Sequence, residues 1–231
     1  AGAARFSDAW PSVPSTPGHD AAGILAAAKA GEIDVLVLLG CDPINDMPDF
    51  DLADAGLSGA RTVISVEMLP SDSTVRFADV VLAAAAPTET SGTFTNLEGR
   101  VSVCEQKVTP AGTSRPDWMI AAELALRLGN DLGLDSPEQI RAELAAVSAV
   151  HGDLTEEALE AGRVDGVLIS GSGDIAAPVA PPAASPANDA YSLRLVATRR
   201  MYDDGVALRY SPASAGLARS IQVRLNPVDF D

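Results

Sequence analysis

Short apolar runs alternate with segments of helical character through the first three quarters of the chain. Residues 35–39 are five apolar residues without alternation, and residues 62–66 are rich in β-branched side chains. Unbroken apolar runs of this length are typical of strands buried on both faces of a parallel sheet that is covered by helices. A shorter strand is predicted at residues 80–82.

The segments between these runs carry start and stop signals of helices. Asp20 is placed to cap a helix that Gly31 ends, and Pro116 and Gly129 bracket an amphipathic helix. Ser136 opens a capping box for a helix to about residue 150. Weaker patterns indicate helices at residues 48–57, 71–77 and 155–161, and a further buried strand at 167–169. We therefore predict an α/β fold over residues 20–175, a doubly wound and mainly parallel sheet flanked by helices.

A change of pattern divides the chain near its last quarter. Residues 176–188 are rich in proline and alanine and carry no charge, which is typical of a linker. Apolar residues then alternate with polar ones around 193–197 and 221–225, which predicts β structure. We expect three parts: an α/β domain at 1–175, a linker at 176–188, and an incomplete β unit at 189–231. Because residue 1 is Ala, we expect a processed or excised piece.

Charge and composition exclude several classes of function. The formal net charge is −16, so the surface repels phosphate backbones and nucleic acid is not an expected partner. No apolar run approaches the roughly 20 residues that span a bilayer, so we expect no direct membrane insertion. The two cysteines and two histidines are far apart, and the sequence predicts no metal site.

Two loops after predicted strands are candidates for ligand sites. The loop at 40–46 contains Asp42 and Asp46, which repel a pyrophosphate; a cation site or, preferably, a structural turn is predicted. Residues 171–173 read Gly-Ser-Gly, but no helix follows to form an anion site, so we interpret them as an exit loop. We predict no catalytic residue in this chain.

The most distinctive motif lies between residues 78 and 101. It reads ADVVL and then, from Glu89 to Arg100, ETSGTFTNLEGR. This order resembles the molybdopterin oxidoreductase superfamily, whose members carry an ADVVLP-type strand followed by E-x-x-G-T-x-x-N-x-E-G-R. Residues 22–43, 199–212 and 225–227 are similar to one branch of it, the large iron–sulfur subunits (G subunits) of bacterial NADH–quinone oxidoreductase, respiratory complex I.

The resemblance implies an architectural role. The α/β part would be the later portion of a molybdopterin-oxidoreductase-like domain, and the residues after the linker the start of a small β-barrel. Iron–sulfur clusters would lie in upstream parts of the subunit, with no cofactor in this segment and no molybdopterin. The implied partners are other complex I subunits of the peripheral arm, at the cytoplasmic face of the bacterial inner membrane.

Departures from the motif suggest a vestigial cofactor pocket. Cofactor-binding relatives often have Asn-Pro after the first strand, where this chain has Asp42, and Asp-Pro-Arg after the next, where it has Glu67. Both changes remove groups that favour an anion. The vestigial-pocket candidates are Asp42, Glu67, Asn96, Glu98 and Arg100. The last two are interpreted as fixing their loop by pairing or by backbone hydrogen bonds. Two alternatives stay open: a catalytic subunit of a molybdopterin-dependent enzyme similar to formate dehydrogenase or nitrate reductase, and a free-standing small-molecule-binding module.

Overall fold

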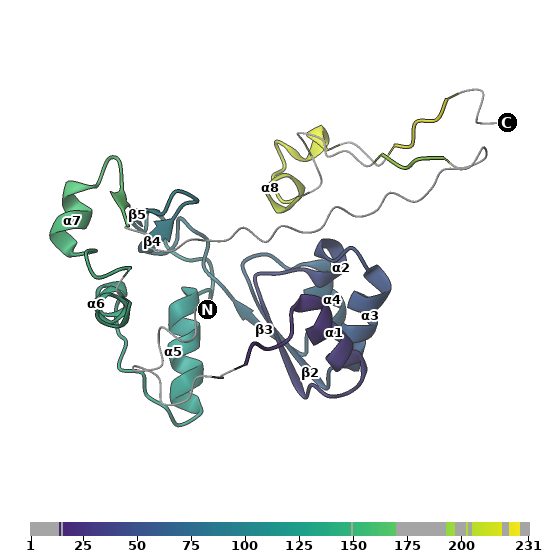
Figure 1. Ribbon diagram of the computed structural model, residues 1–231, viewed down its shortest axis with the longest axis horizontal. Helices are drawn as coiled ribbons and strands as arrows, with labels where there is room; N and C mark the ends of the chain where they lie inside the picture. The colour runs from purple at the N-terminus through teal and green to yellow at the C-terminus, as the bar shows by residue number, and fades with distance from the viewer. Residues whose placement is uncertain are drawn as a thin grey trace. The chain divides into compact units, whose positions relative to one another are not determined.

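The computed structural model describes residues 14, 16–148, 150–169, 193–196, 202, 205–218 and 222–226. The chain forms two compact units, Ala1–Asp174 and Ile175–Asp231, and each is described by itself. Figure 1 shows the helices and strands of the first unit, which are α1 (Ala21–Lys29), β1 (Val35–Leu39), α2 (Pro43–Asp46), α3 (Phe50–Gly59), β2 (Thr62–Glu67), α4 (Asp72–Phe77), β3 (Val80–Ala83), β4 (Gly92–Thr95), β5 (Arg100–Cys104), α5 (Asp117–Arg127), α6 (Pro137–Val147), α7 (Glu156–Ala161) and β6 (Val167–Leu168).

A three-stranded parallel sheet forms the centre of the first unit. Its strand order is β1-β2-β3, and Val37 lies opposite Ile64, which in turn lies opposite Val80. The parallel strands predicted at 35–39 and 62–66 are therefore confirmed, within a mixed α/β fold. Asp20 caps α1 by accepting a hydrogen bond from the N–H of Gly23 at 2.8 Å, as predicted.

Helices α1 to α4 gather on one side of this sheet (Figure 1). Leu36 and Leu38 of β1 are buried in the layer between the sheet and these helices. Burying such side chains contributes about 1.5–3 kcal/mol each, so this layer is the main source of stability in the unit. The buried cluster consists of Leu25, Leu36, Leu38, Ile44, Ala53, Leu57 and Val63.

Two glycines allow α1 and α3 to pack closely. A β-carbon added to Gly56 would lie 2.7 Å from the carbonyl oxygen of Leu25 and 2.9 Å from its β-carbon, and one added to Gly59 would collide with the carbonyl oxygen of Ala28. Glycine weakens a helix interior by about 1 kcal/mol relative to alanine. The close approach of the two backbones explains why Gly56 is nevertheless present inside α3.

The opposite face of the sheet is covered only in part. Helix α5 packs Ile120 against Val66, Leu82 and Ala84, but Val35, Val37 and Leu39 of β1 are 51%, 46% and 71% exposed. The prediction that strand 35–39 is buried on both faces is wrong for the part of the chain that the structure describes. The reason is that α1 to α4 all lie on the other face.

A second, antiparallel sheet follows, with strand order β4-β5-β6. Its first strand, β4, was not predicted from the sequence; β4 forms a hairpin with β5 and places Thr95 opposite Val101. The strand predicted at 167–169 is the two-residue β6 at the edge of this sheet, with Leu168 58% exposed. The described strands thus form two sheets, the predicted parallel one and an antiparallel one, in which β4 and β5 run in opposite directions because a short hairpin joins them.

The described residues of the second unit contain a short helix, α8 (Val206–Arg209), and a 3-10 turn, η2 (Ala215–Leu217). Residues 193–196 and 222–226 form no strand, so the β structure predicted there is absent from the described positions, and no closed barrel is present in them. The predicted linker at 176–188 lies outside the described residues, and the three-part division stays a prediction. Within the described residues, no helix has both the length and the hydropathy to cross a bilayer.

Gly56→Ala tests the close packing of α1 on α3. We expect the free energy of unfolding to fall by about 1–3 kcal/mol, because the cost of forcing a methyl group into a packed interface exceeds the gain in helix propensity. Urea unfolding followed by circular dichroism measures the change. Ser58→Ala, at an exposed position of the same helix, is the matched control and should change stability by less than about 0.5 kcal/mol. A neutral or stabilising Gly56→Ala would contradict the packing described here.

Candidate functional site at the carboxyl edge of the parallel sheet

The carboxyl ends of parallel strands meet at one edge of a sheet, which is where α/β folds place their ligands. In this chain β1 leads through Gly40 and Cys41 to Asp42, and β2 ends at Glu67. Helix α4 begins beside both of them. The sequence candidates Asp42 and Glu67 therefore belong to one site, which we call the edge site and define as Asp42, Asn45, Glu67, Ser71, Ser73 and Thr74.

Asp42 joins the first turn of α4 to the loop after β1. Its Oδ1 accepts hydrogen bonds from the N–H of Ser73 at 3.1 Å and from the hydroxyl of the same residue at 2.5 Å, while Oδ2 accepts from Nδ2 of Asn45 at 2.6 Å. Burial raises the pKa of this carboxyl, but the hydrogen bonds from Asn45 and Ser73 lower it further than burial raises it. The net effect is a pKa below the ordinary 3.8. The site therefore stabilises Asp42 as an anion.

Glu67 is the buried carboxylate of the edge site, with 8% of its surface exposed. One oxygen accepts from the N–H of Ser71 at 3.0 Å and from the hydroxyl of Thr74 at 2.8 Å, and the other accepts from the hydroxyl of Ser71 at 2.9 Å. The hydroxyl of Thr74 also contacts that of Ser65 at 2.7 Å. A buried carboxylate is costly unless it is hydrogen bonded, and these three donors meet that requirement.

The donors at the start of α4 are thus already used by carboxylates of this chain. A helix N-terminus with free N–H groups favours a phosphate, whereas here the N–H groups of Ser71 and Ser73 point to Glu67 and Asp42. The two carboxylates, Asp42 and Glu67, also give the edge site negative charge. The residues of the edge site do not fit a pyrophosphate, because they present acceptors and anions where that group needs donors and cations.

Cys41 lies next to this site but is not activated. Desolvation raises the pKa of its thiol above the ordinary 9.0, the N–H of Leu39 opposes that rise, and the carboxylates of Glu67, Asp46 and Asp42 add to it. The thiolate is the nucleophilic and metal-binding form of cysteine. Around neutral pH Cys41 is consequently a poor nucleophile. Among the described residues, no group of three or more His, Cys, Asp or Glu side chains is arranged to hold a metal ion.

The other three candidates organise the turn between β4 and β5. The side-chain oxygen of Asn96 accepts from the N–H of Glu98 at 2.9 Å and from that of Arg100 at 3.0 Å. Arg100 pairs with Glu98 at 3.3 Å, as the sequence predicted, and also donates to the carbonyl oxygen of Asp165 at 3.1 Å. Arg100 therefore ties the hairpin to the loop before β6. Among the described contacts, no hydrogen bond joins this group to the edge site.

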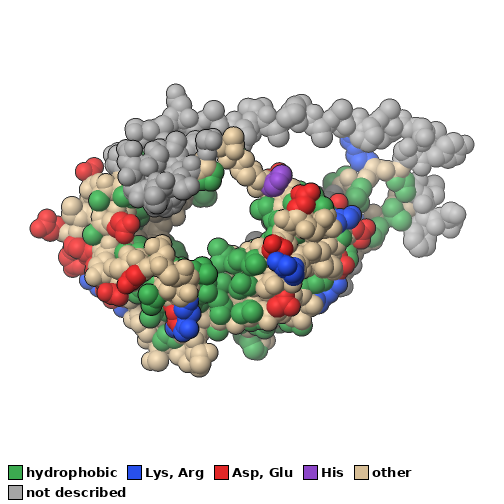
Figure 2. All heavy atoms as spheres, turned by 90° about the horizontal axis from the view of Figure 1, so that it is seen from below, with side chains coloured by type: hydrophobic (Ala, Val, Ile, Leu, Met, Phe, Trp, Pro, Cys, Tyr) green, Lys and Arg blue, Asp and Glu red, His purple; other side chains and the backbone are tan. Residues whose placement is uncertain are grey.

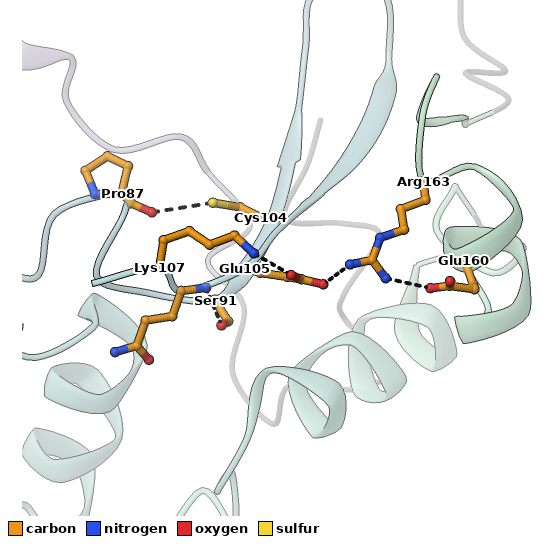
Figure 3. Close-up of polar contacts among 8 residues, drawn as sticks. Pro87, Ser91, Cys104, Glu105, Lys107, Glu160 and Arg163 are labelled. Atoms are coloured by element: carbon orange, nitrogen blue, oxygen red, sulfur yellow. Dashed lines mark hydrogen bonds and ion pairs between the residues drawn. The ribbon is translucent and has the colours of Figure 1, made fainter. Parts of the chain in front are cut away.

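Ion pairs connect the same hairpin to α7. The carboxylate of Glu105 receives Lys107 at 2.6 Å and also pairs with Arg163, which reaches Glu160 at 3.2 Å (Figure 3). Close to them lies a cavity of about 220 Å³ between the hairpin and helices α6 and α7. Arg141, whose side chain is 13% exposed, lines it and pairs with Glu156 and Glu138. Because each arginine is already paired twice, the cavity offers little positive charge for an anion.

Sequence reasoning missed several residues that build these groups. The sequence pattern indicates only a weak helix around Ser73 and Thr74, although these residues connect α4 to both carboxylates. The signal was the run of hydroxyl residues in Ser71-Asp72-Ser73-Thr74, which follows a strand that ends in an acid. The partners of Arg100 and Glu105 in the segment 160–165 lie too far along the chain to be inferred from spacing.

Comparison with known proteins gives the class to which this chain belongs. Residues 2–127 match the family Molybdopterin oxidoreductase, and the match spans the parallel sheet, the hairpin and α5. The chain is a member of the molybdopterin oxidoreductase family.

Individual members of the family show how similar the chain is to particular proteins. The chain is 36% identical to the G subunit of NADH-quinone oxidoreductase of Streptomyces coelicolor over 152 residues, which cover 64% of this chain and 18% of that protein. It is 32% identical to the G subunit of the Mycobacterium bovis NADH-quinone oxidoreductase over 228 residues, 97% of this chain and 26% of that protein. It is 28% identical to the NADPH-Fe(3+) oxidoreductase subunit alpha of Geobacter sulfurreducens over 227 residues, again 97% and 26%. The chain thus spans about a quarter of the length of the relatives that it matches throughout.

Asp42→Asn tests the hydrogen bonding of the edge site. A carboxyl whose folded pKa is lowered adds stability above its ordinary pKa, and that stability is lost as the pH falls through the folded pKa. We therefore expect the variant to lose about 1–3 kcal/mol near neutral pH, and the difference from the unaltered chain to shrink below about pH 4. Urea unfolding at several pH values measures it.

Asp51→Asn is the matched control for this prediction, because Asp51 is an exposed acid in the first turn of α3. It should cost only a few tenths of a kcal/mol. An equal effect of both substitutions, or a loss from Asp42→Asn that does not diminish in acid, would contradict the account of Asp42 given above.

Proposed function

We propose that this chain is part of the large iron–sulfur subunit of an NADH–quinone oxidoreductase, and that its role there is structural, without a catalytic centre of its own. Two relatives that are G subunits of this enzyme support the proposal, one of them similar over nearly the whole chain. The full subunit would carry iron–sulfur clusters, and its partners would be other subunits of the peripheral arm. The complex would lie at the cytoplasmic face of the bacterial inner membrane.

The observation that carries the structural role is the use of Asp42 and Glu67. In cofactor-binding members of the family, the loops at this edge meet a negatively charged dinucleotide. Here the two carboxylates engage the donors at the start of α4. A charge-assisted hydrogen bond is worth roughly 1.5–3 kcal/mol, so exchanging these bonds for contacts with another anion is unfavourable. We infer that the edge site stabilises the fold of this domain and does not hold molybdopterin.

The cysteine content agrees with an electron path that runs outside this chain. Iron–sulfur clusters are held by several cysteine thiolates, and the chain has two cysteines, Cys41 and Cys104. Cys104 donates its S–H to the carbonyl oxygen of Pro87 at 3.4 Å, which is a local contact (Figure 3). The motif residues Asn96, Glu98 and Arg100 serve the hairpin, and we propose that the same is true in the assembled complex.

Glu98→Ala and Arg100→Ala test this role in the complete complex. We expect both to lower the amount of assembled complex. Arg100→Ala removes the link between the hairpin and the loop before β6, and Glu98→Ala removes the ion pair that holds Arg100. NADH oxidation with an artificial acceptor, normalised to flavin, should stay within about twofold of the unaltered enzyme, because the proposed electron path runs outside this chain. A twofold change in rate corresponds to about 0.4 kcal/mol in the activation free energy.

Arg61→Ala is the control for the arginine substitution. Arg61 pairs with Asp34, but both side chains are more than 70% exposed, and such pairs contribute little. Assembly should be unaffected. Normal assembly of the Arg100 variant with a large loss of turnover per flavin would instead place this segment in the chemistry, and the structural role would have to be abandoned.

A second candidate function, catalysis by a molybdenum or tungsten pterin, follows from the family match itself. Elemental analysis separates the two. For the purified complete protein we expect iron in stoichiometric amounts and molybdenum or tungsten below about a tenth of an atom per polypeptide, because the donors of the edge site are already engaged by Asp42 and Glu67. One atom per polypeptide, together with extractable pterin, would establish the catalytic alternative.

A further inference from the structure

Helix α6 is joined to α7, but it buries little of its own surface. In the described part of the chain, no residue of α6 is buried, although helices of this length depend mostly on tertiary packing for their stability. The two helices are linked by Arg141, which donates from Nε and Nη2 to Oε1 of Glu156 at 3.0 and 2.7 Å. Much of the surface of α6 is therefore open to another molecule.

An open groove of about 520 Å³ lies next to this ion pair. We call it the α6–α7 groove and define it by six residues that line it, which are Ala142, Ala145, Leu154, Glu138, Arg141 and Glu156. The side chains of Glu138 and Glu156 are 61% and 66% exposed, so their carboxylates are accessible from solvent. Pockets that hold ligands typically have volumes of about 300–1,000 Å³. The groove therefore has room for a large apolar side chain of another molecule, with two carboxylates beside it.

The surroundings of the α6–α7 groove are strongly acidic. Residues 131–165 contain nine aspartates and glutamates, all of them exposed, and two arginines. Both arginines, Arg141 and Arg163, already pair with two glutamates each. Figure 2 shows acidic side chains spread over the left part of the view, which is the side of α6 and α7 in Figure 1, with few basic ones among them. Such an excess of exposed carboxylates attracts cationic partners and repels anionic ones.

The chemistry of this surface indicates the kind of molecule that fits it. An apolar centre with a charged and exposed rim is typical of a protein–protein interface. A second copy is opposed by the formal net charge of −16 on each chain, and nucleic acid and anionic lipid are opposed in the same way. Covering the rim with an apolar surface would bury carboxylates without partners, which is costly. A basic protein segment avoids both penalties, because it brings cations to the rim.

We propose that the α6–α7 groove binds a basic segment of a partner protein. A leucine or aromatic side chain of that segment enters the groove against Ala142 and Leu154, and flanking lysines or arginines pair with Glu138 and Glu156. Binding energy at such interfaces is concentrated in a few central anchor residues, whereas charges at the rim increase the rate of association and make it sensitive to salt. The proposal goes beyond the structural role proposed above, and it holds whichever reaction the complete protein carries out.

Two synthetic peptides test the proposal on the complete protein, purified in concentrated salt to release a partner that is held by charge. Both peptides are amphipathic helices with the same leucine and tryptophan face, and their polar positions are lysine in one and glutamate in the other. Measured by fluorescence anisotropy, the lysine peptide should bind saturably, and its affinity should fall about fivefold or more between roughly 50 and 200 mM salt. The glutamate peptide should not bind.

Substitutions on α6 show whether the lysine peptide uses the groove. Ala142→Trp fills the groove and should weaken binding of the peptide about tenfold. Ala146→Trp is the matched control, at an exposed alanine of the same helix outside the groove, and should change the affinity by less than about twofold. Both alanines are exposed, so both variants should fold, which circular dichroism checks.

A second pair of variants tests the charges and does not depend on filling the groove. Glu138→Gln should weaken binding of the lysine peptide about threefold, while Glu157→Gln, at an exposed glutamate of α7 outside the groove, should weaken it by less than about 1.5-fold. Equal losses within either pair would show attraction by overall charge alone. That result, failure of the lysine peptide to bind, or equal binding of the glutamate peptide would each overturn the proposal.

Discussion

The structure of the first unit depends on the handedness of its parallel connections. Because each crossover turns the same way and the strands follow one another in order, the connecting helices α2, α3 and α4 lie on one face of the sheet, and α1 packs against α3 on that face. That face becomes a dense core, in which Gly56 lets two helix backbones approach closely. Among the helices in the described residues, only α5 packs on the other face. The difference between the packed face and the exposed face follows from the order of the strands and not from their composition, since the side chains of β1 are apolar on both faces.

The edge site is a consequence of the same arrangement. Parallel strands end together, so Asp42 and Glu67 are brought to one edge although two helices, α2 and α3, and the strand β2 lie between them in sequence. α4 begins there, and its first turn presents N–H and hydroxyl donors that need partners. The two carboxylates supply them, and in return the donors lower the cost of a buried anion at Glu67. Unpaired donors in the first turn of α4 and unpaired carboxylates beside them would each be unfavourable, and at this site each group satisfies the other.

The sequence predicted most helices and both central strands, because caps such as Asp20 and the apolar runs at 35–39 and 62–66 are local signals. It did not predict that one face of β1 is exposed in the described part of the chain, since an apolar run does not specify what covers each face of a strand. β4 was missed because Gly92-Thr93-Phe94-Thr95 has too few apolar residues for a period to be detected. In the candidate site, the pairing of Glu98 with Arg100 was predictable from adjacency. The hydrogen bond between Asp42 and Ser73 joins residues 31 positions apart and was not.

The mutual dependence of Asp42, Glu67 and the first turn of α4 also restricts how such a sequence can change. Replacing Glu67 alone by a cation would leave the hydroxyls of Ser71 and Thr74 without their acceptor and place positive charge at the positive end of a helix. Replacing Asp42 alone would leave the N–H and the hydroxyl of Ser73 without their acceptor, whereas Asn45 would keep its hydrogen bond to Asp72. Conversion of the edge site into an anion-binding loop by single substitutions would therefore pass through less stable intermediates. The edge site thus constrains which sequences this part of the fold can accept one substitution at a time.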